Sequence, residues 1–280
     1  MGVIFEPGYT LPQGDQPLTH ARIAHSGTWV DDWNASATST ADGFFVDGPN
    51  DSLTYEYWSP TTLPATWTLQ PMGFGQEATV DYCCIAAHTL GTAALNLTLT
   101  IEYLNPPVDS PSVWNTIISD ASISDDSPIF AIFRPVTAIG LRVTINGTTA
   151  PRIGVIRFGQ ALQMPQPLYG GHTPLILSRQ TTMRSNKSTT GEFLGRTRLR
   201  NARSTEIGWT HLRADWVREY WRPFQFAMEE DPFFLAWRPI TFPNDVGYCY
   251  VDGGSLPAPA NMGIKDFMSV SMNVIARGYD

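Results

Sequence analysis

The chain has 280 residues, of which 42% are hydrophobic, 16% charged and 12% aromatic, and this composition excludes a disordered or collagen-like protein. No run of eighteen apolar residues occurs, and the N-terminus lacks a basic segment followed by an apolar one, so we expect neither a membrane span nor a secretory signal. Residues 1–165 carry 15 acidic and 5 basic side chains, whereas residues 166–280 carry 11 acidic and 13 basic ones. Because the first half is so acidic, we do not expect sequence-specific nucleic acid as a partner.

The first half of the chain predicts an extended segment followed by strands. Residues 1–20 contain Pro7, Pro12 and Pro17, and we expect them to form an extended N-terminal arm that lies against a neighbour. From about residue 20 to 160, short β-branched and aromatic runs alternate with separators rich in Gly, Pro, Asn, Asp and Ser. This pattern predicts a mainly β fold, with an N-terminal β-sandwich of the jelly-roll type over residues 21–163.

The second half predicts a smaller α+β domain. Residues 162–174 hold three Pro and two Gly at the change of charge, so we place the boundary there and assign residues 164–280 to the second domain. Its one main helix is expected from Leu212 to about Glu230, with a kink or break at Pro223. The run PFFLAW that follows predicts a buried strand.

The strand pattern of residues 35–160 resembles the galactose-binding-domain-like, or discoidin-like, jelly-roll family. Asp47-Gly48 precedes Thr54 and Trp58, and a late strand carries Arg142 and Val143 in IGLRVTING. The cysteine pair of many extracellular members is missing, and the usual Leu-Asp-Leu-Gly turn is replaced by residues 69–72, Leu-Gln-Pro-Met. The resemblance implies the jelly-roll fold, but not a ligand, because the binding loops of this family vary.

The second half resembles virion structural proteins of long-tailed bacteriophages, through FLGRTRLR, WTHL, PFFLAWRP and the final ANMGIKDFMSVSMNVIARGYD. The resemblance implies a non-enzymatic protein of the distal tail or baseplate, located in the virion tail and assembled in the host bacterial cytoplasm. Its implied partners are the tail tube, hub and baseplate proteins and further copies of itself in a ring, commonly a hexamer. Three cysteines, an odd number, agree with a reducing compartment.

The usual signatures of catalysis and cofactor binding are missing. The sequence contains no nucleophile elbow, phosphate loop or zinc-protease helix, and we expect no catalytic residue, cofactor or metal. Residues 73–78, Gly-Phe-Gly-Gln-Glu-Ala, match a dinucleotide fingerprint, but a predicted strand follows instead of the required helix. Asp31-Asp32 and Asp125-Asp126 are either solvated turn acids or contributors to a calcium site.

Sugar binding is the alternative function. Aromatic rings present flat apolar faces to a pyranose, and nearby polar groups bind its hydroxyls. If the jelly roll brings its loops to one rim, the carbohydrate-binding candidates are Trp29, Asp31, Trp33, Tyr57 and His88. The protein would then be a host-glycan adhesin anchored to the tail or, in further alternatives, a soluble lectin or a glycan-active enzyme.

Subunit contacts are the chemistry that the tail interpretation requires. Arg196, Arg198 and Arg200 alternate, so on a strand all three are expected on one face, where they serve a subunit contact, line a DNA channel or meet solvent. Aromatic and Arg residues are enriched in interfaces. The interface candidates are therefore Arg196, Arg198, Arg200, Trp216, Tyr220 and Trp221.

Overall fold

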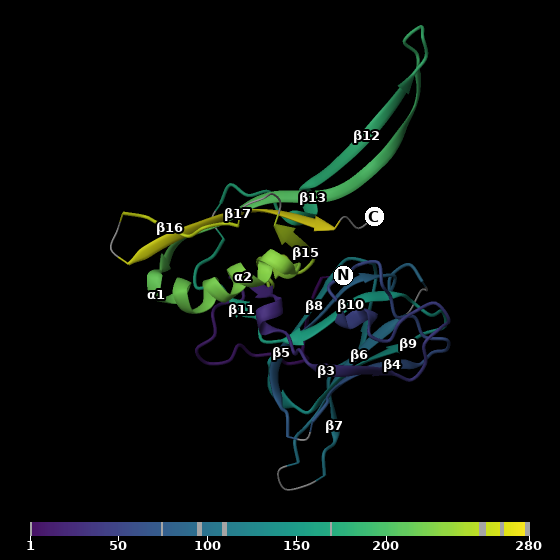
Figure 1. Cartoon of the computed structure of the whole chain (residues 1–280), viewed down its shortest axis with the longest axis vertical. Helices are drawn as coiled ribbons and strands as arrows, with labels where there is room; N and C mark the ends of the chain where they lie inside the picture. The colour runs from purple at the N-terminus through teal and green to yellow at the C-terminus, as the bar shows by residue number, and fades with distance from the viewer. Residues whose placement is uncertain are drawn as a thin grey trace.

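The structure is a computed structural model that describes residues 2–73, 75–93, 97–107, 111–168, 170–251, 256–263 and 266–277. Its strands form sheets of four, five and eight strands, and its main helix lies in the C-terminal part (Figure 1). The expected mainly β fold, with a β-sandwich jelly roll and a smaller α+β domain, is confirmed.

The jelly roll consists of the two smaller sheets packed face to face. The four-stranded sheet has the order β1 (Val3–Phe5), β8 (Ile129–Ala138), β5 (Ala78–His88) and β10 (Ile153–Gly159). The five-stranded sheet has the order β3 (Trp33–Ala37), β4 (Ala65–Pro71), β9 (Gly140–Asn146), β6 (Thr98–Leu104) and β7 (Trp114–Ser122). Alternate residues of both sheets enter one core, which Trp58 and Trp67 help to fill.

The eight-stranded sheet belongs to the second domain but begins near the N-terminus. Its strands are β2 (Arg22–Ala24), β11 (Leu162–Gln163), β12 (Arg179–Lys187), β13 (Phe193–Arg213), β14 (Phe233–Ala236), β15 (Val246–Val251), β16 (Ala260–Asn261) and β17 (Phe267–Arg277). Short 3₁₀ turns occur at Ser26–Thr28, Gly48–Asn50 and Leu175–Leu177.

The N-terminal segments differ from the expected domain boundaries. Strand β2, which we assigned to the jelly roll, pairs instead with β14 and β11 of the eight-stranded sheet. Apart from β1, the jelly roll is therefore inserted between β2 and β11 of the second domain. Strand β1 of the expected N-terminal arm pairs in parallel with β8 of this same chain. Local sequence could not reveal these pairings, because they join residues more than a hundred positions apart.

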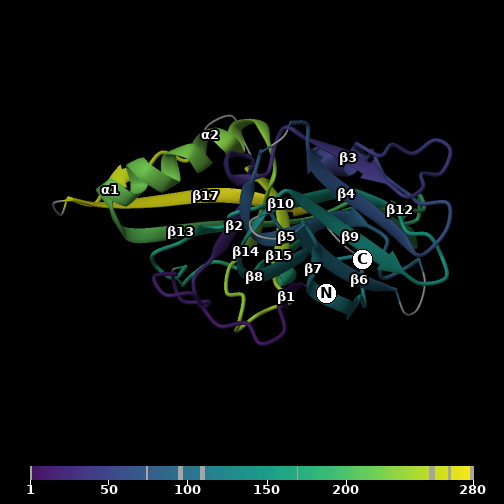
Figure 2. The same cartoon turned by 90° about the horizontal axis from the view of Figure 1, so that it is seen from below.

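The main helical segment covers one face of the eight-stranded sheet (Figure 2). It runs as α1 (Ala214–Trp216), a π-helical turn (Val217–Trp221) and α2 (Arg222–Glu230). Helix begins two residues later than expected, because Leu212 and Arg213 still pair with β17. Pro223 lies in the first turn of α2, directly after the π-helical turn, as its missing N–H favours.

A third cluster of buried residues, separate from the cores of the two domains, joins the domains to each other. Neighbouring residues of β14 alternate between the two faces of its sheet: Phe233 packs toward the helices, and Phe234 packs toward the jelly roll. Phe234 meets Tyr82 and Phe130 of the four-stranded sheet in one apolar cluster. The four-stranded sheet and the β2, β14 and β15 part of the eight-stranded sheet are thus covered on both faces, and the molecule is four layers thick there.

Candidate functional site

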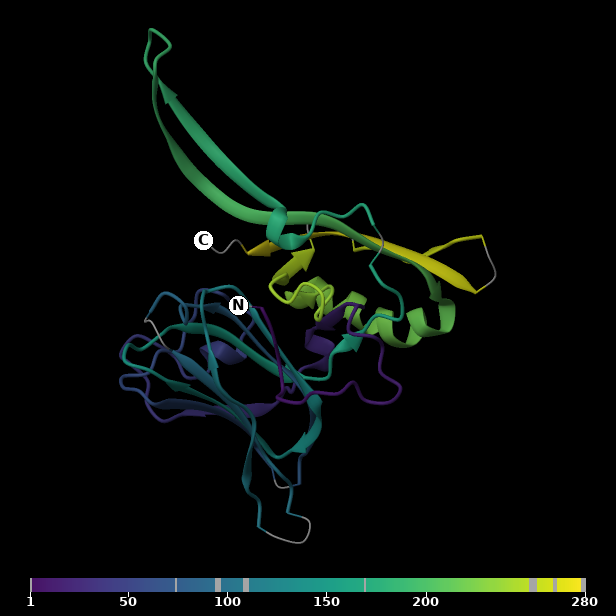
Figure 3. The same cartoon turned by 180° about the vertical axis from the view of Figure 1, so that it is seen from behind.

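A long β-hairpin leaves the body of the protein. It consists of β12 and the first part of β13, and we call residues 179–203 the projecting hairpin (Figures 1 and 3). Nearly every residue of β12 is exposed. Four apolar side chains of the hairpin expose between 51% and 64% of their surface: Met183, Phe193, Leu194 and Leu199.

The projecting hairpin also presents open strand edges. Strand β12 is the last strand of its sheet, and β13 pairs with β17 only from Ala202 onward. Among the described residues, positions 193–201 therefore pair with β12 alone. A two-stranded ribbon with open edges and exposed apolar side chains is marginally stable in water and is a template for pairing with another chain.

The predicted arginine row lies on this hairpin. Arg196 donates to Ser185 Oγ at 3.1 Å and reaches the Met183 sulfur at 3.8 Å, so it lies on the face of its opposite strand partners. Arg198 pairs with Met183 and Arg200 with Thr182. The β-bulge between these two pairs interrupts the strict alternation of β13 there, and the side chain of Arg200 lies outside the described part of the structure.

Trp29 and Trp33 do not form the expected sugar-binding surface. Trp29 and Trp33 expose only 9% and 7% of their surface, and the Arg157 guanidinium lies over the Trp29 ring at 4.1 Å. Asp31 is exposed and Tyr57 is partly exposed. The prediction that Trp29 and Trp33 stack on a sugar is therefore wrong, because both rings pack in the interior.

His88 is also unsuited to a ligand. It is buried, its Nε2 lies 2.9 Å from the Ser127 carbonyl oxygen, and its Nδ1 accepts from the Leu90 N–H at 3.3 Å. Burial lowers the pKa of His88 to about 4, so the ring is neutral at physiological pH and Nε2 donates to the carbonyl. Both ring nitrogens are thus used by the backbone, and the prediction of His88 as a sugar ligand is wrong.

An interdomain cleft of about 600 Å³ was not predicted, although two predicted interface residues line it. We call it the helix cleft. Its walls include Trp216 and Tyr220, whose rings stack with centroids 5.9 Å apart and whose planes differ by 29°. Tyr220 is 47% exposed, whereas Trp221 is completely buried. Trp221 therefore cannot contact another subunit, because it packs on Trp209 and Phe224 inside the domain.

Carboxyl and amide groups also line the helix cleft. Asp81 accepts from the Ala161 N–H at 2.8 Å, and burial raises the pKa of Asp81 to about 7. The Gln163 side chain is held in place by the backbone N–H of Gln16, which donates to its Oε1 at 2.8 Å. Asp15 also lines the cleft. Aromatic faces near such groups can bind a polyhydroxylated ligand.

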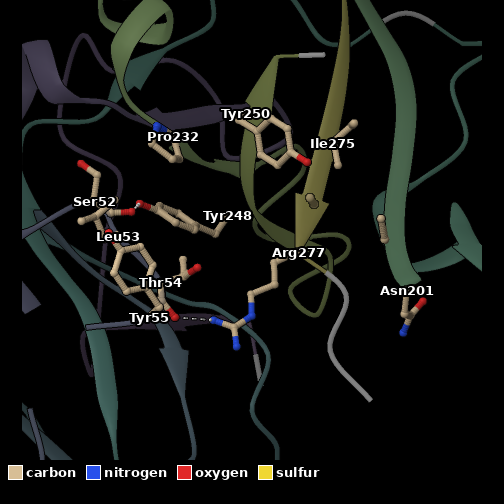
Figure 4. A pocket seen from close by; sticks show the side chains of 12 residues that line it. Ser52, Leu53, Thr54, Tyr55, Asn201, Pro232, Tyr248, Tyr250, Ile275 and Arg277 are labelled. Atoms are coloured by element: carbon tan, nitrogen blue, oxygen red, sulfur yellow. Dashed lines mark hydrogen bonds between the residues drawn. The ribbon is translucent and has the colours of Figure 1, made fainter. Parts of the chain in front are cut away.

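A second depression, of about 530 Å³, lies between the domains beside the base of the hairpin. We call it the domain groove; Figure 4 shows the jelly-roll loop Ser52–Tyr55 facing Tyr248, Tyr250 and Arg277. The Tyr248 hydroxyl donates to the Ser52 carbonyl at 2.8 Å, and Arg277 donates to the Thr54 carbonyl at 3.4 Å. These bonds join the two walls and fix the width of the groove.

The part of the chain that the structure describes contains neither a cluster of metal-binding side chains nor a long apolar helix. No three His, Cys, Asp or Glu side chains gather there to hold a metal ion. No described helix combines the length and the apolar character that crossing a bilayer would need.

The chain matches no family model, and no curated protein is similar to it in sequence. Among solved structures it is similar to a chitosan-binding module from a Paenibacillus chitosanase/glucanase, with 16% identity, a TM-score of 0.39, and coverage of 49% of this chain and 98% of that one. It is also similar to a family 32 carbohydrate-binding module of Clostridium perfringens NanJ, in complex with galactose, with 16% identity and a TM-score of 0.38. This match covers 47% of this chain and 97% of that module. A GH29 fucosidase of Ruminococcus gnavus, in complex with fucose, matches with 15% identity and a TM-score of 0.37. The match covers 48% of this chain but only 26% of the length of that enzyme.

Proposed function

We propose that this protein is an assembly subunit whose projecting hairpin binds a neighbouring copy. The single observation that carries the proposal is the hairpin itself, a ribbon with open edges and four apolar side chains that are each at least half exposed. Burying apolar surface of this kind stabilises an interface by roughly 25 cal/mol per Å² before the costs of association. A second copy supplies that burial.

The more specific proposal is a structural, non-enzymatic protein of a bacteriophage tail, located in the virion and assembled in the bacterial cytoplasm. It is supported by the resemblance of residues 164–280 to distal tail proteins and by a hairpin suited to binding adjacent subunits. The three cysteines are free and buried, as a protein made in a reducing compartment requires. A closed ring needs unlike surfaces that meet head to tail, and a hexamer is the copy number that the resemblance implies.

Replacing the apolar side chains of the hairpin tests the proposal. In the full chain, Phe193→Ser, Leu194→Ser and Leu199→Ser combined should convert a multi-subunit particle into a 31.0 kDa monomer, measured by light scattering after size exclusion. Phe45→Ser is the matched control, since Phe45 is equally exposed but lies on a jelly-roll loop. A wild-type chain that is monomeric, or a triple variant with wild-type mass, contradicts the proposal.

Sugar binding is the second candidate function, and the helix cleft favours it. The stacked Trp216 and Tyr220 rings line the same cleft as carboxyl and amide groups, and the acidic side chains of the cleft favour a neutral sugar over an acidic one. A glycan array probed with the full chain should give signals that Tyr220→Ala removes and Phe226→Ala retains, because Phe226 is exposed on the same helix and does not line the cleft. An array without signal, or equal signals from both variants, removes this candidate.

A further inference from the structure

Charge separates the projecting hairpin from the rest of the molecule. Residues 179–203 contain seven Lys or Arg and one Glu, a net charge of +6. The remaining 255 residues contain 11 basic and 25 acidic side chains, a net charge of −14. Opposite fields of this size steer one copy of the protein toward another and orient the hairpin toward the body of its neighbour.

The domain groove offers the hairpin apolar side chains, with acidic groups beside it and one cation, Arg277, in its lining. Leu53, Tyr55 and Tyr250 line it, and Tyr55 exposes 69% of its surface. Asp231 accepts from Ser52 Oγ at 2.6 Å, which places its carboxylate next to the groove loop. Burial raises the pKa of Tyr248 well above its usual value; the nearby Arg157 guanidinium lowers this pKa, and the Asp231 and Asp51 carboxylates raise it.

We propose that the domain groove of one copy binds the projecting hairpin of the next copy, with the apolar hairpin side chains on Tyr55 and Tyr250 and the positive charge of the hairpin toward the carboxylates of Asp51 and Asp231. This inference rests on the proposed function, which requires only that the hairpin binds a neighbour, and adds the surface that receives it. The groove volume of about 530 Å³ accommodates several side chains.

The hairpin cannot fill the groove of its own chain. Asn201 and Ala202, at its base, form part of the groove wall, and from there the hairpin curves away from the body (Figure 1). Strand β12 has nine residues, so the hairpin extends roughly 30 Å, whereas a compact 280-residue chain has a radius of gyration of about 19 Å. It therefore reaches well across an adjacent copy.

The two contacting surfaces are different, so each copy both offers a hairpin and receives one. Such head-to-tail contacts close into a ring or continue as a filament. They also make a specific prediction for mixtures, since a copy that lacks a functional hairpin still has an intact groove, and the reverse holds for a copy with a blocked groove.

The experiment uses two variants of the full chain that carry opposite defects. The hairpin variant is Phe193→Ser, Leu194→Ser and Leu199→Ser; the groove variant is Leu53→Arg with Tyr55→Arg, which alters exposed side chains and places cations where the basic hairpin should bind. Each variant alone should be monomeric. An equimolar mixture should form a dimer of twice 31.0 kDa and nothing larger, because only one of its interfaces is intact.

Other outcomes separate the two claims. If the hairpin variant is monomeric but the groove variant assembles like wild type, the groove is the wrong receiving surface and the proposed function survives. If the hairpin variant also assembles like wild type, the proposed function fails. Two monomeric variants that do not pair when mixed overturn the head-to-tail contact. Phe45→Arg is the control for the added charge, and unchanged far-UV circular dichroism shows that the variants are folded.

A cross-link gives an independent readout. Leu199→Cys and Tyr55→Cys in one chain should cross-link between copies through a bismaleimide, and the native cysteines do not interfere because all three are buried. A product of 31.0 kDa alone on a denaturing gel, from a chain that assembles, contradicts the placement of the hairpin in the groove.

Discussion

The layer between the domains should behave as a structural core, and Phe234→Ala tests this most sharply. Phe234 is completely buried, its ring centroid lies 4.7 Å from that of Tyr248, and it faces the four-stranded sheet of the jelly roll. Truncating such a ring removes its transfer free energy and leaves a cavity, which costs about 3–5 kcal/mol of unfolding free energy. The measurement is urea unfolding of the full chain followed by circular dichroism.

The neighbouring residue supplies the control. Phe233→Ala removes an equally buried ring from the same strand, but on the helix side of the sheet, and should cost a similar amount. Amide exchange distinguishes the two variants: Phe234→Ala should accelerate exchange in β5, which lies across the interdomain layer, and Phe233→Ala should accelerate it in α2. A cost below about 1 kcal/mol for Phe234→Ala, or faster exchange in α2 alone, would refute the view of a cohesive layer.

Three further predictions concern buried groups. Because burial raises the pKa of Asp81 to about 7, the folded protein should lose stability as the pH rises from about 4 to 7. Asp81→Asn should flatten this part of the plot of melting temperature against pH. Equal slopes for the wild type and the variant would contradict the prediction. A Cβ at Gly159 would overlap the Thr28 carbonyl oxygen, so Gly159→Ala should cost about 1–3 kcal/mol in the same urea assay, and an unchanged midpoint would show that the backbone can move. Burial raises the thiol pKa of every cysteine, so alkylation at pH 8 should be negligible in native protein and complete in denaturant, with rapid native alkylation as the contrary result.

Local patterns predicted the elements of this fold well. The alternating runs became strands because their β-branched and aromatic residues fit a pleated surface, and PFFLAW became the buried strand β14. Pro223 marks the place where the helical segment changes from a π-helical turn to α2. These features depend on residues close in the sequence, which is why the sequence alone predicts them.

The candidate sites depend on packing between distant segments, which local sequence patterns do not show. Trp29 looked available for a sugar, but Arg157, 128 positions later, lies over its ring. Trp221 looked like an interface residue, yet it faces the sheet, whereas Tyr220, one position away on the same turn, faces solvent. The arginine row of the projecting hairpin was predicted as part of a strand, but its projection from the body was not, because exposed and buried strands contain the same residue types. The hairpin stands apart from the sheet because, among the described residues, β13 pairs with β17 only from Ala202 onward.

The central claim is that copies of this chain assemble through the projecting hairpin. Electron microscopy of the purified full-length protein tests it most directly. We predict closed rings or head-to-tail chains in which a thin ribbon from each copy lies across the body of the next. A field of separate 31.0 kDa particles, each with its hairpin free in solvent, would contradict the account.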